Sequence, residues 1–570
     1  MKKEVVVSFK DFSFRYKTQQ EATLHDINLD IFKGEKILIL GPSGCGKSTL
    51  ANCINGLIPH SYPGEITGSV KVAGIETKES SLFELSKHVG TVQQDSDAQF
   101  VGLSVGEDIA FALENKAMPR AEMLPIVDQS ARTVGMEDYL LQPPFELSGG
   151  QKQKVALAGI LHDAEEILLF DEPLASLDPA MGMTAVDLID RIHRESERTV
   201  IIIEHRFEDV LYRHVDRVIL INDGRIIRDC TPDEILSSGI LKEKGIRAPL
   251  YIEALENAGI KFAQNEHLDN INELDFAKYR DAVIEEFEKT KPFTVGEKGE
   301  VLIDVKHVDF AYNPDRKVLN DINFTIRRGE KVAIVGKNGA GKSTMAKLLC
   351  GIIRPVRGTI EIKGENYLAL TIRDIGRLIG YVMQNPNQML VKDIINEEVR
   401  LALNLNEFDQ KTADERVEET LKMTGLYPMR NWPISVLSYG QKKRVTIASI
   451  LALQPDCIIL DEPTAGQDYR HYTEIMNFIE ELNRDFGKTI IFITHDMHLA
   501  IEYTERALVF ADGKLIADDY VYKVLSDKKI IEQANLKETS LVLMARAVGL
   551  DPEQFIRHFI AKEREGRANG

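Results

Sequence analysis

The sequence is poor in cysteine and has no long hydrophobic run, and each shortage excludes a class of protein. Its five cysteines are scattered and form no CxxC pair: Cys45, Cys53, Cys230, Cys350 and Cys457. This spacing excludes a disulfide framework and a zinc or iron–sulfur site, and it suits a reducing cytoplasm. No segment approaches the roughly 18 to 20 apolar residues that cross a bilayer, so we expect any membrane role to be peripheral.

The sequence also lacks an excess of basic residues. The chain has 70 Lys and Arg against 89 Asp and Glu, which gives a formal net charge of -19. An acidic protein is a poor candidate for coating nucleic acid, because phosphate neutralisation needs clustered positive charge. The remaining composition, 44% hydrophobic and 28% charged, is that of a globular protein, and 570 residues suffice for two or three domains.

The same ordered set of motifs occurs twice. The first half reads GPSGCGKST, VQQD, LSGGQKQK, ILLFDEP, SLD and IIIEH, and the second reads GKNGAGKST, VMQN, LSYGQKKR, CIILDEP, GQD and IFITH. Lys47 and Lys342 are 295 positions apart. Four later pairs are each 290 apart: Gln94 and Gln384, Ser148 and Ser438, Glu172 and Glu462, His205 and His495. One five-residue length difference explains both spacings, so the chain contains a duplicated domain.

Each copy alternates short apolar runs with helix-like stretches, which predicts an α/β fold with a mostly parallel sheet. Lys36–Leu40 and Lys331–Val335 each run into a glycine-rich turn and then a helix-like segment. We predict domains at residues 1–240 and 299–530, separated by 241–298 and followed by a helical tail at 531–570. From Tyr251 to Glu300 there are 12 acidic and 6 basic residues. This middle segment is either a solvated linker or a small accessory domain that contacts a partner.

The sequence G-x-x-x-x-G-K-S marks a phosphate-binding loop in each copy. Its glycines let successive backbone N–H groups face inward and cradle phosphate at the start of a helix. The lysines can reach the β- and γ-phosphates, and Ser48 and Ser343 can ligate Mg²⁺. The predicted ATP-binding residues are Gly41, Pro42, Ser43, Gly44, Cys45, Gly46, Lys47, Ser48 and Thr49 in the first copy, and Gly336, Lys337, Asn338, Gly339, Ala340, Gly341, Lys342, Ser343 and Thr344 in the second.

An apolar strand in each copy ends in two adjacent carboxylates, Asp171–Glu172 and Asp461–Glu462. We predict that each aspartate holds the magnesium shell and that each glutamate orients or deprotonates the attacking water. Acidic residues also cap strand ends without any catalytic role. Their position about 120 residues after a phosphate loop favours catalysis.

The LSGGQ motif at Leu147–Gln151 narrows the class. On this motif and the others in their order, the chain resembles the ATP-binding-cassette family over residues 4–235 and 301–520. The resemblance implies two P-loop nucleotide-binding domains in tandem, each with a parallel sheet core and a helical subdomain, joined head to tail. The Lys47 loop would then face Ser438, Tyr439, Gly440 and Gln441, and the Lys342 loop would face Ser148, Gly149, Gly150 and Gln151.

Six further positions match the family pattern. Tyr16 and Tyr312 fit the aromatic that stacks on adenine, with a core edge-strand aromatic as the alternative. Gln94 and Gln384 fit the glutamine that senses Mg²⁺ and the nucleophile and borders the transporter-contact surface. His205 and His495 fit the γ-phosphate histidine, and the alternative is a satisfied core histidine.

Two residues depart from the pattern. Tyr439 replaces the first glycine of the second signature, giving LSYGQ. This is either a tolerated substitution that points away from nucleotide or a source of slower turnover at the Lys47 site. Cys45 lies inside the first phosphate loop, beside Lys47 and a helix N-terminus. We predict that these neighbours lower its pKa and that a thiol reagent therefore inactivates this site selectively.

The biological role follows from the resemblance rather than from the ATPase motifs. The GQD sequence, the segments after the glutamines and the stretch GIRAPLYIEALENAGI resemble the energy-coupling-factor ATPases, which drive uptake of vitamins, their precursors, cobalt or nickel. The resemblance implies a transmembrane scaffold protein and a small substrate-binding membrane protein as partners. The segments after Gln94 and Gln384 differ, so we expect non-identical partner surfaces.

The same resemblance implies a peripheral location on the cytoplasmic face of the membrane. It implies no nucleic acid and no obligate homodimer, since both copies share one chain. One alternative is a soluble tandem ATPase acting on ribosomes, although such proteins carry a basic arm between their copies. A DNA-repair or structural-maintenance ATPase would need zinc modules or long coiled coils.

Overall fold

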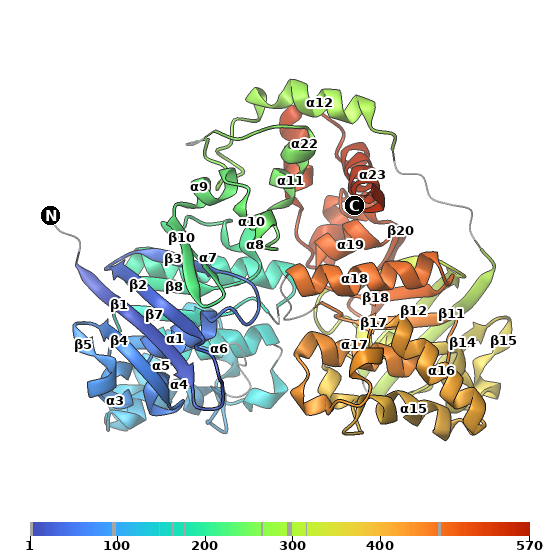
Figure 1. Cartoon of the computed structure of the whole chain (residues 1–570), viewed down its shortest axis with the longest axis horizontal. Helices are drawn as coiled ribbons and strands as arrows, with labels where there is room; N and C mark the ends of the chain where they lie inside the picture. The colour runs from blue at the N-terminus through green and yellow to red at the C-terminus, as the bar shows by residue number, and fades with distance from the viewer. Residues whose placement is uncertain are drawn as a thin grey trace. The chain divides into compact units, whose positions relative to one another are not determined.

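A computed structural model of the chain describes residues 4–93, 99–147, 149–161, 165–175, 177–263, 266–292, 299–314, 316–464 and 469–569. The chain divides into two compact units, Met1–Ala282 (unit 1) and Val283–Gly570 (unit 2). The division falls inside the predicted middle segment. Each unit contains one copy of the repeat, and each is described by itself below (Figure 1).

Each unit is built on a six-stranded sheet in which one edge strand is antiparallel. In unit 1 the strand order is β10 (Arg225–Cys230), β9 (Arg217–Asn222), β3 (Lys36–Leu40), β8 (Thr199–Ile203), β7 (Ile167–Asp171) and β6 (Val89–Val92). In unit 2 it is β20 (Lys514–Tyr520), β19 (Arg506–Ala511), β13 (Lys331–Gly336), β18 (Thr489–Ile493), β17 (Cys457–Asp461) and β16 (Ile379–Val382). The central strands are buried along their whole length, as their continuous apolar runs predict.

A four-stranded antiparallel sheet covers one side of each core. Its strands are β2 (Leu24–Phe32), β1 (Val5–Tyr16), β4 (Gly64–Val72) and β5 (Ile75–Glu76) in unit 1, and β12 (Arg316–Arg327), β11 (Val301–Asn313), β14 (Arg357–Ile362) and β15 (Glu365–Asn366) in unit 2. The helix after each phosphate loop, α1 (Lys47–Ile54) or α13 (Lys342–Leu349), contributes buried side chains to the same core. Short helices α2 (Leu57–His60), α3 (Leu82–Ser86) and α14 (Ile372–Leu378) lie in the following segments.

Each unit also has a layer of three helices that forms a helical subdomain. These are α4 (Val105–Asn115), α5 (Arg120–Val134) and α6 (Gly149–Leu161) in unit 1, and α15 (Ile395–Leu405), α16 (Gln410–Met423) and α17 (Tyr439–Leu451) in unit 2. The unit 2 layer has its own apolar core, which includes Val399, Leu421 and Val445. Helices α7 (Pro179–Ser196) and α8 (Phe207–Val210), and α18 (Tyr469–Arg484) and α19 (Met497–Tyr503), follow the acidic strand ends. The predicted α/β architecture with a helical subdomain in each copy is confirmed.

The duplication continues beyond the ATPase motifs. After β10, unit 1 adds α9 (Pro232–Ser237), α10 (Ile240–Glu243) and α11 (Leu250–Asn257), and after β20, unit 2 adds α20 (Val521–Val524), α21 (Lys528–Gln533) and α22 (Ser540–Val548). In each unit these helices lie at the opposite end from the helical subdomain (Figure 1). The described part of residues 241–298 is therefore largely helical, with α12 (Arg280–Lys289) following, while α23 (Pro552–Asn569) forms the predicted tail.

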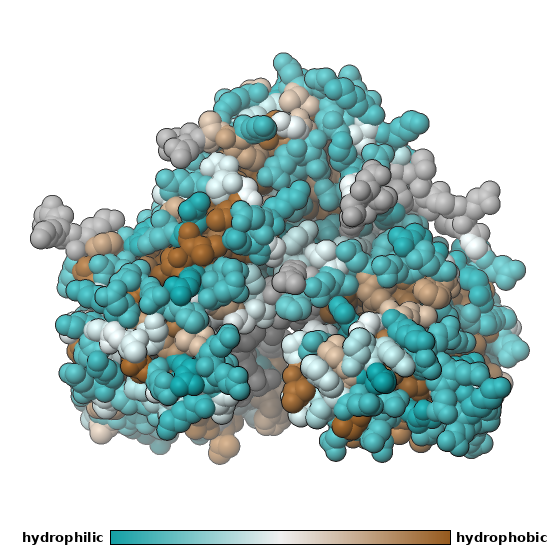
Figure 2. Space-filling view, viewed as in Figure 1, coloured by the Kyte–Doolittle hydropathy of each residue, from teal (hydrophilic) through white to brown (hydrophobic). Residues whose placement is uncertain are grey.

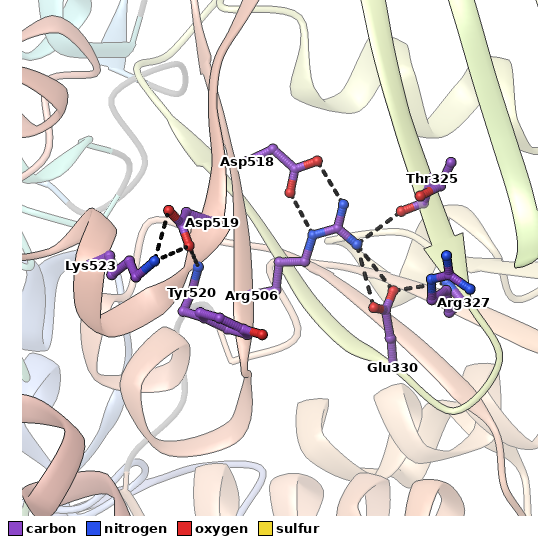
Figure 3. A network of polar contacts seen from close by, with 8 residues as sticks. All are labelled: Thr325, Arg327, Glu330, Arg506, Asp518, Asp519, Tyr520 and Lys523. Atoms are coloured by element: carbon purple, nitrogen blue, oxygen red, sulfur yellow. Dashed lines mark hydrogen bonds and ion pairs between the residues drawn. The ribbon is translucent and has the colours of Figure 1, made fainter. Parts of the chain in front are cut away.

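A buried arginine joins the antiparallel and parallel sheets of each unit. In unit 2 the guanidinium of Arg506 donates to the Thr325 carbonyl at 2.9 Å, to Glu330 at 3.2 Å and to Asp518 at 2.6 Å (Figure 3). Arg217 of unit 1 makes the equivalent ion pairs with Glu35 and Asp229. Such bidentate contacts satisfy a guanidinium that burial would otherwise destabilise.

A buried lysine ties the phosphate-loop strand to the helix behind it. Lys36 Nζ lies 2.9 Å from Asp190 Oδ1 on α7, and the side chains are only 1% and 9% exposed. In unit 2, Lys331 of β13 makes the same kind of pair with Glu480 of α18. Each pair fixes the strand from which the phosphate loop emerges.

We predict that Lys36→Met lowers the free energy of unfolding of unit 1 by about 3 kcal/mol, because it removes one partner of a buried ion pair. Urea unfolding followed by circular dichroism measures this. The matched control is Lys33→Met, whose partner Glu4 lies 3.5 Å away with both side chains more than half exposed. That change should cost less than about 0.5 kcal/mol. Equal destabilisation by both variants would contradict the prediction.

Candidate active site

The two phosphate loops connect a buried strand to a helix, as the sequence predicts. Gly336 ends β13 with a φ of 135°, and a Cβ there would lie 1.9 Å from the Phe510 carbonyl oxygen. At Gly41 the corresponding Cβ would lie 2.2 Å from the Ile221 carbonyl oxygen. Only glycine fits such a close approach between the loop and the next strand. The loops Gly41–Thr49 and Gly336–Thr344 therefore hold their turn without a ligand.

The two loop lysines curl back over their own loops. Lys47 Nζ donates to the carbonyls of Gly41 at 2.9 Å and Pro42 at 2.8 Å. Lys342 Nζ donates to Gly336 at 2.7 Å and to the Lys337 carbonyl at 2.9 Å. Both lysines are buried, and their ammonium groups sit at the loop where phosphate is expected. Each loop thus presents a cation together with inward-facing amides.

The predicted carboxylates lie at the carboxyl ends of β7 and β17. Asp171 Oδ1 is 3.4 Å from Ser48 Oγ, which brings the two predicted magnesium ligands of unit 1 together. In unit 2, Asp461 instead accepts a 2.7 Å hydrogen bond from the Tyr381 hydroxyl. Burial raises the pKa of Asp171, and the Ser48 hydrogen bond opposes that shift.

Each predicted catalytic glutamate has an unusual backbone. Glu172 has a φ of 51° and Glu462 a φ of 44°, the left-handed region that non-glycine residues seldom occupy. Their N–H groups donate to the carbonyls of Ile203 at 2.8 Å and Ile493 at 2.9 Å. The left-handed turn directs each chain out of the sheet directly after the acidic pair. The same left-handed turn thus occurs at the equivalent place in both units, as it also does at other paired turns such as Ala73 with Lys363.

Each glutamate meets the predicted histidine of its own unit. His205 Nε2 lies 3.1 Å from Glu172 Oε1, and His495 Nε2 lies 3.6 Å from Glu462 Oε1. All four side chains are largely but not fully buried, with exposures between 12% and 20%. Burial is the main cause that raises the pKa of Glu462, and the neighbouring Asp461 charge adds to it. A carboxylate held in this way is a suitable proton acceptor.

The predicted adenine-stacking tyrosines lie beside the phosphate loops. The Tyr16 hydroxyl is 3.2 Å from Thr49 Oγ1, and the Tyr312 hydroxyl is 3.5 Å from Thr344 Oγ1. Tyr312 is 59% exposed, whereas the ring of Tyr16 packs edge to face against Tyr62 at 6.5 Å. Tyr62 belongs to the five-residue length difference between the copies. The sequence analysis missed this second aromatic, although the length difference pointed to its segment.

The second signature motif forms the start of α17. Ser438 caps the helix by accepting from the Gln441 N–H at 3.3 Å, and the Gln441 side chain accepts from the Ser438 N–H at 3.0 Å. Tyr439 and Gly440 form its first turn. In unit 1, Gly149, Gly150 and Gln151 begin α6, but Ser148 lies outside the described residues.

The glutamine loop of unit 2 is bonded to this signature turn. The Gln384 carbonyl accepts from the Tyr439 hydroxyl at 3.0 Å and from Lys443 Nζ at 2.8 Å. Lys443 is a residue that the sequence analysis missed, and burial lowers its pKa to about 8. A difference between the copies marked this position, because the first copy has Gln153 where the second has Lys443. Gln94 lies outside the described residues, as do Ser176 and the GQD residues Gly466–Asp468.

The prediction of a reactive Cys45 is wrong. Its side chain is only 5% exposed, and a Cβ on Gly41 would lie 2.6 Å from its sulfur, so the thiol faces the inside of the loop. Burial raises the pKa of Cys45, and this effect exceeds the lowering by Lys47. The structure therefore gives no reason to expect selective inactivation by a thiol reagent.

The residues around Asp171 suit a magnesium ion. A carboxylate and a serine hydroxyl at 3.4 Å offer the hard oxygen ligands that Mg²⁺ prefers, next to a lysine that binds phosphate. In unit 2, Ser343 follows Lys342 in the same motif, and Asp461 ends the equivalent strand. The donor set of unit 1 thus fits one ion bound together with a nucleotide, whereas Asp461 of unit 2 accepts a hydrogen bond from Tyr381.

Comparison with known proteins matches both copies to one family. The family described as ABC transporter matches residues 24–175 and 319–465. A second family, described as ATP-binding cassette cobalt transporter, matches residues 238–310, a range that includes the whole of the predicted middle segment.

Two relatives are similar along their whole lengths. A protein of Clostridium perfringens (strain 13 / Type A), named as an ABC transporter ATP-binding protein, is 53% identical over 569 residues and covers 100% of both chains. One of Enterococcus faecalis, with the same description, is 53% identical over 570 residues, 99% of this chain and 100% of that one. A solved structure of cbiO1 from C. perfringens, part of the ABC transporter complex cbiONQ, is 33% identical over 42% of this chain and 95% of that one, with a TM-score of 0.38.

The two loop–carboxylate–histidine sites and the family match to both copies lead to one conclusion. This chain belongs to the ABC transporter family, as an ATPase with two ATP-binding domains in tandem.

Proposed function

We propose that this chain is the ATPase subunit of an energy-coupling-factor importer that takes up a vitamin, a vitamin precursor or a transition metal. The observation that carries the proposal is the match of residues 238–310 to a family described as ATP-binding cassette cobalt transporter. Two sets of ATPase motifs in one chain agree with it. The relatives reported above are described as transporter components, so nothing favours the ribosome-associated alternative.

In this proposal each phosphate loop binds the phosphates of ATP, and its lysine exchanges carbonyl partners for phosphate oxygens. Glu172 and Glu462 orient the attacking water and accept its proton; each is paired with a histidine, and burial raises the pKa of Glu462. His205 and His495 hold these glutamates and face the γ-phosphate. When Mg²⁺ is bound, it neutralises charge on the phosphates, and Ser48, Gln94, Asp171, Ser343, Gln384 and Asp461 are the side chains proposed to hold it.

The family resemblance supports two composite sites in a head-to-tail arrangement. Ser438, Gly440 and Gln441 would complete the Lys47 site, while Ser148, Gly149, Gly150 and Gln151 would complete the Lys342 site. Tyr16 and Tyr312 would stack on adenine. ATP then joins the two copies, and release of phosphate separates them. Since both copies belong to one chain, no homodimer is required.

An exposed apolar patch on unit 1 supports a membrane partner. Leu103 is 84% exposed, Leu141 93% and Phe145 78%. The start of α4 is bonded to the turn that carries Leu141, since the Val105 N–H donates to the Gln142 carbonyl. Large exposed apolar side chains gathered in this way mark an interaction surface.

The same place on unit 2 is different, which supports two non-identical partner surfaces. Asp393, Asn431 and Ser435 stand at the three equivalent positions. Unit 2 exposes Trp432 (50%) and Val436 (65%) nearby, and also Val391 (73%), whose counterpart Val101 is exposed in unit 1 as well (62%). Figure 2 shows hydrophobic residues in small separate groups over the α15–α17 layer on an otherwise hydrophilic face.

The proposed partners are a transmembrane scaffold protein and a small substrate-binding membrane protein, with the chain peripheral on the cytoplasmic face. Within the described ranges, no helix is long and apolar enough to cross a membrane. The test is a mild-detergent pull-down of the tagged chain from native membranes, followed by mass spectrometry. We expect a polytopic scaffold and one small membrane protein. Recovery with ribosomal proteins and no membrane protein would overturn the transport role.

We predict that Glu172→Gln with Glu462→Gln reduces ATP hydrolysis by at least about 10²-fold, because both general bases are lost. Phosphate release measures turnover, and filter binding should show ATP retained in each single variant. Glu197→Gln, at the exposed end of α7, is the matched control and should keep parental turnover. Undiminished hydrolysis in the double variant would refute the catalytic assignment.

We predict that Leu103→Ser with Phe145→Ser abolishes recovery of the membrane partners in the pull-down while the detached chain keeps its ATPase rate within about twofold. The control is Phe83→Ser on α3, which removes another exposed aromatic (55%) from unit 1. Loss of the partners with the Phe83 variant as well would show that the apolar patch is not specific.

A further inference from the structure

Unit 2 contains a cluster of bonds that fastens its glutamine loop to its signature helix. Tyr439 is the first residue of α17, and its hydroxyl donates to the Gln384 carbonyl at 3.0 Å. One turn later, Lys443 Nζ donates to the same carbonyl at 2.8 Å and to the Met383 carbonyl at 3.1 Å. Between them in sequence, Lys442 Nζ lies 3.2 Å from Asn387 Oδ1. Three side chains thus make four hydrogen bonds between the start of one helix and one loop.

Lys443 is deeply placed for a lysine. Its side chain is 1% exposed, and besides the two loop carbonyls it reaches the Glu462 carbonyl at 3.4 Å. An ammonium buried among carbonyl oxygens is favourable only while those oxygens stay in place, because each lost partner leaves a desolvated charge. The lysine therefore holds the glutamine loop, the signature turn and the residue after the acidic strand in one fixed arrangement.

The first copy lacks the residues for such a cluster. Gly149 stands where unit 2 has Tyr439, and it has no side chain to donate. Gln153 stands where unit 2 has Lys443, and it carries no charge. Gln153 instead lines a mainly apolar pocket between α6, β7 and α7, together with Phe170 and Met181. The difference between LSGGQKQK and LSYGQKKR therefore changes which side chains of the signature helix can donate hydrogen bonds to the glutamine loop.

We propose that Tyr439 and Lys443 are positioning residues that make the glutamine loop and the signature turn of unit 2 move as one body during the ATPase cycle. This inference rests on the proposed function. In that function Gln384 senses the bound nucleotide and borders the membrane partner, and the residues Ser438–Gln441 bind ATP. A nucleotide-driven shift of the signature turn is then passed directly to the partner-facing loop of unit 2. In unit 1, positions 149 and 153 carry neither the tyrosine hydroxyl nor the ammonium group that makes this link in unit 2.

The first test is hydrogen exchange of the full-length chain without nucleotide. Tyr439→Phe removes one donor and keeps the ring, and Lys443→Gln installs the first copy's residue. Each should speed exchange of residues 383–388 by about tenfold, which is the effect expected from one lost hydrogen bond. Exchange in the remainder of unit 2 should stay within about threefold of the parent. Gln153→Ala, at the matched position of unit 1, should leave residues 383–388 unchanged.

The second test uses a Glu172→Gln chain, in which only Glu462 is left as the proposed base. Adding Tyr439→Phe or Lys443→Gln should lower kcat about tenfold and leave the KM for ATP within about threefold, because positioning acts on the transition state more than on binding. Exchange at 383–388 within twofold of the parent in both variants would overturn the proposal, as would uniformly faster exchange across unit 2. If the Glu172→Gln chain itself hydrolyses no ATP, the proposed role of Glu462 fails, and the exchange result alone decides the link.

Discussion

The parallel register of the central strands is the constraint on which both sites depend. In unit 2, Ile334 of β13 pairs with Ile493 of β18, which in turn pairs with Asp461 of β17. In unit 1, Ile203 of β8 pairs with both Ile39 and Asp171. Because parallel strands end at the same edge, the phosphate loop emerges beside the acidic pair and the histidine although it precedes them by more than a hundred residues.

Buried charge then determines how precisely this edge is held. Lysines enter the core only with partners: Lys36 with Asp190, and Lys47 with the carbonyls of its own loop. These contacts satisfy the buried ammonium groups, because a desolvated charge without partners would destabilise the fold. Arg217 and Arg506 lie at the opposite end of the sheet. Their ion pairs with Glu35 and Glu330 hold the junction with the antiparallel sheet.

The sequence was informative wherever a motif fixed backbone geometry. The repeat, the parallel sheet and the loops could be predicted, because glycine spacing and apolar strands leave few alternatives. The glutamates and histidines were singled out one by one, but their contact was not predicted. Burial of Cys45 depends on where its loop turns, and this reversed the expected pKa shift. Differences between the two copies marked the positions of Lys443 and Tyr62, but they could not show which residues these side chains meet. The roles of Gln94 and Ser148 stay predictions, since the structure does not describe these residues.

The left-handed backbone of Glu172 and Glu462 has a consequence for how this protein can evolve. A non-glycine residue at such a φ destabilises the fold by roughly 1 kcal/mol, and glycine would relieve it. Substitution by glycine would at the same time remove the carboxylate that serves as the base in the proposed mechanism. Stability and the proposed turnover would therefore favour different residues at these two positions.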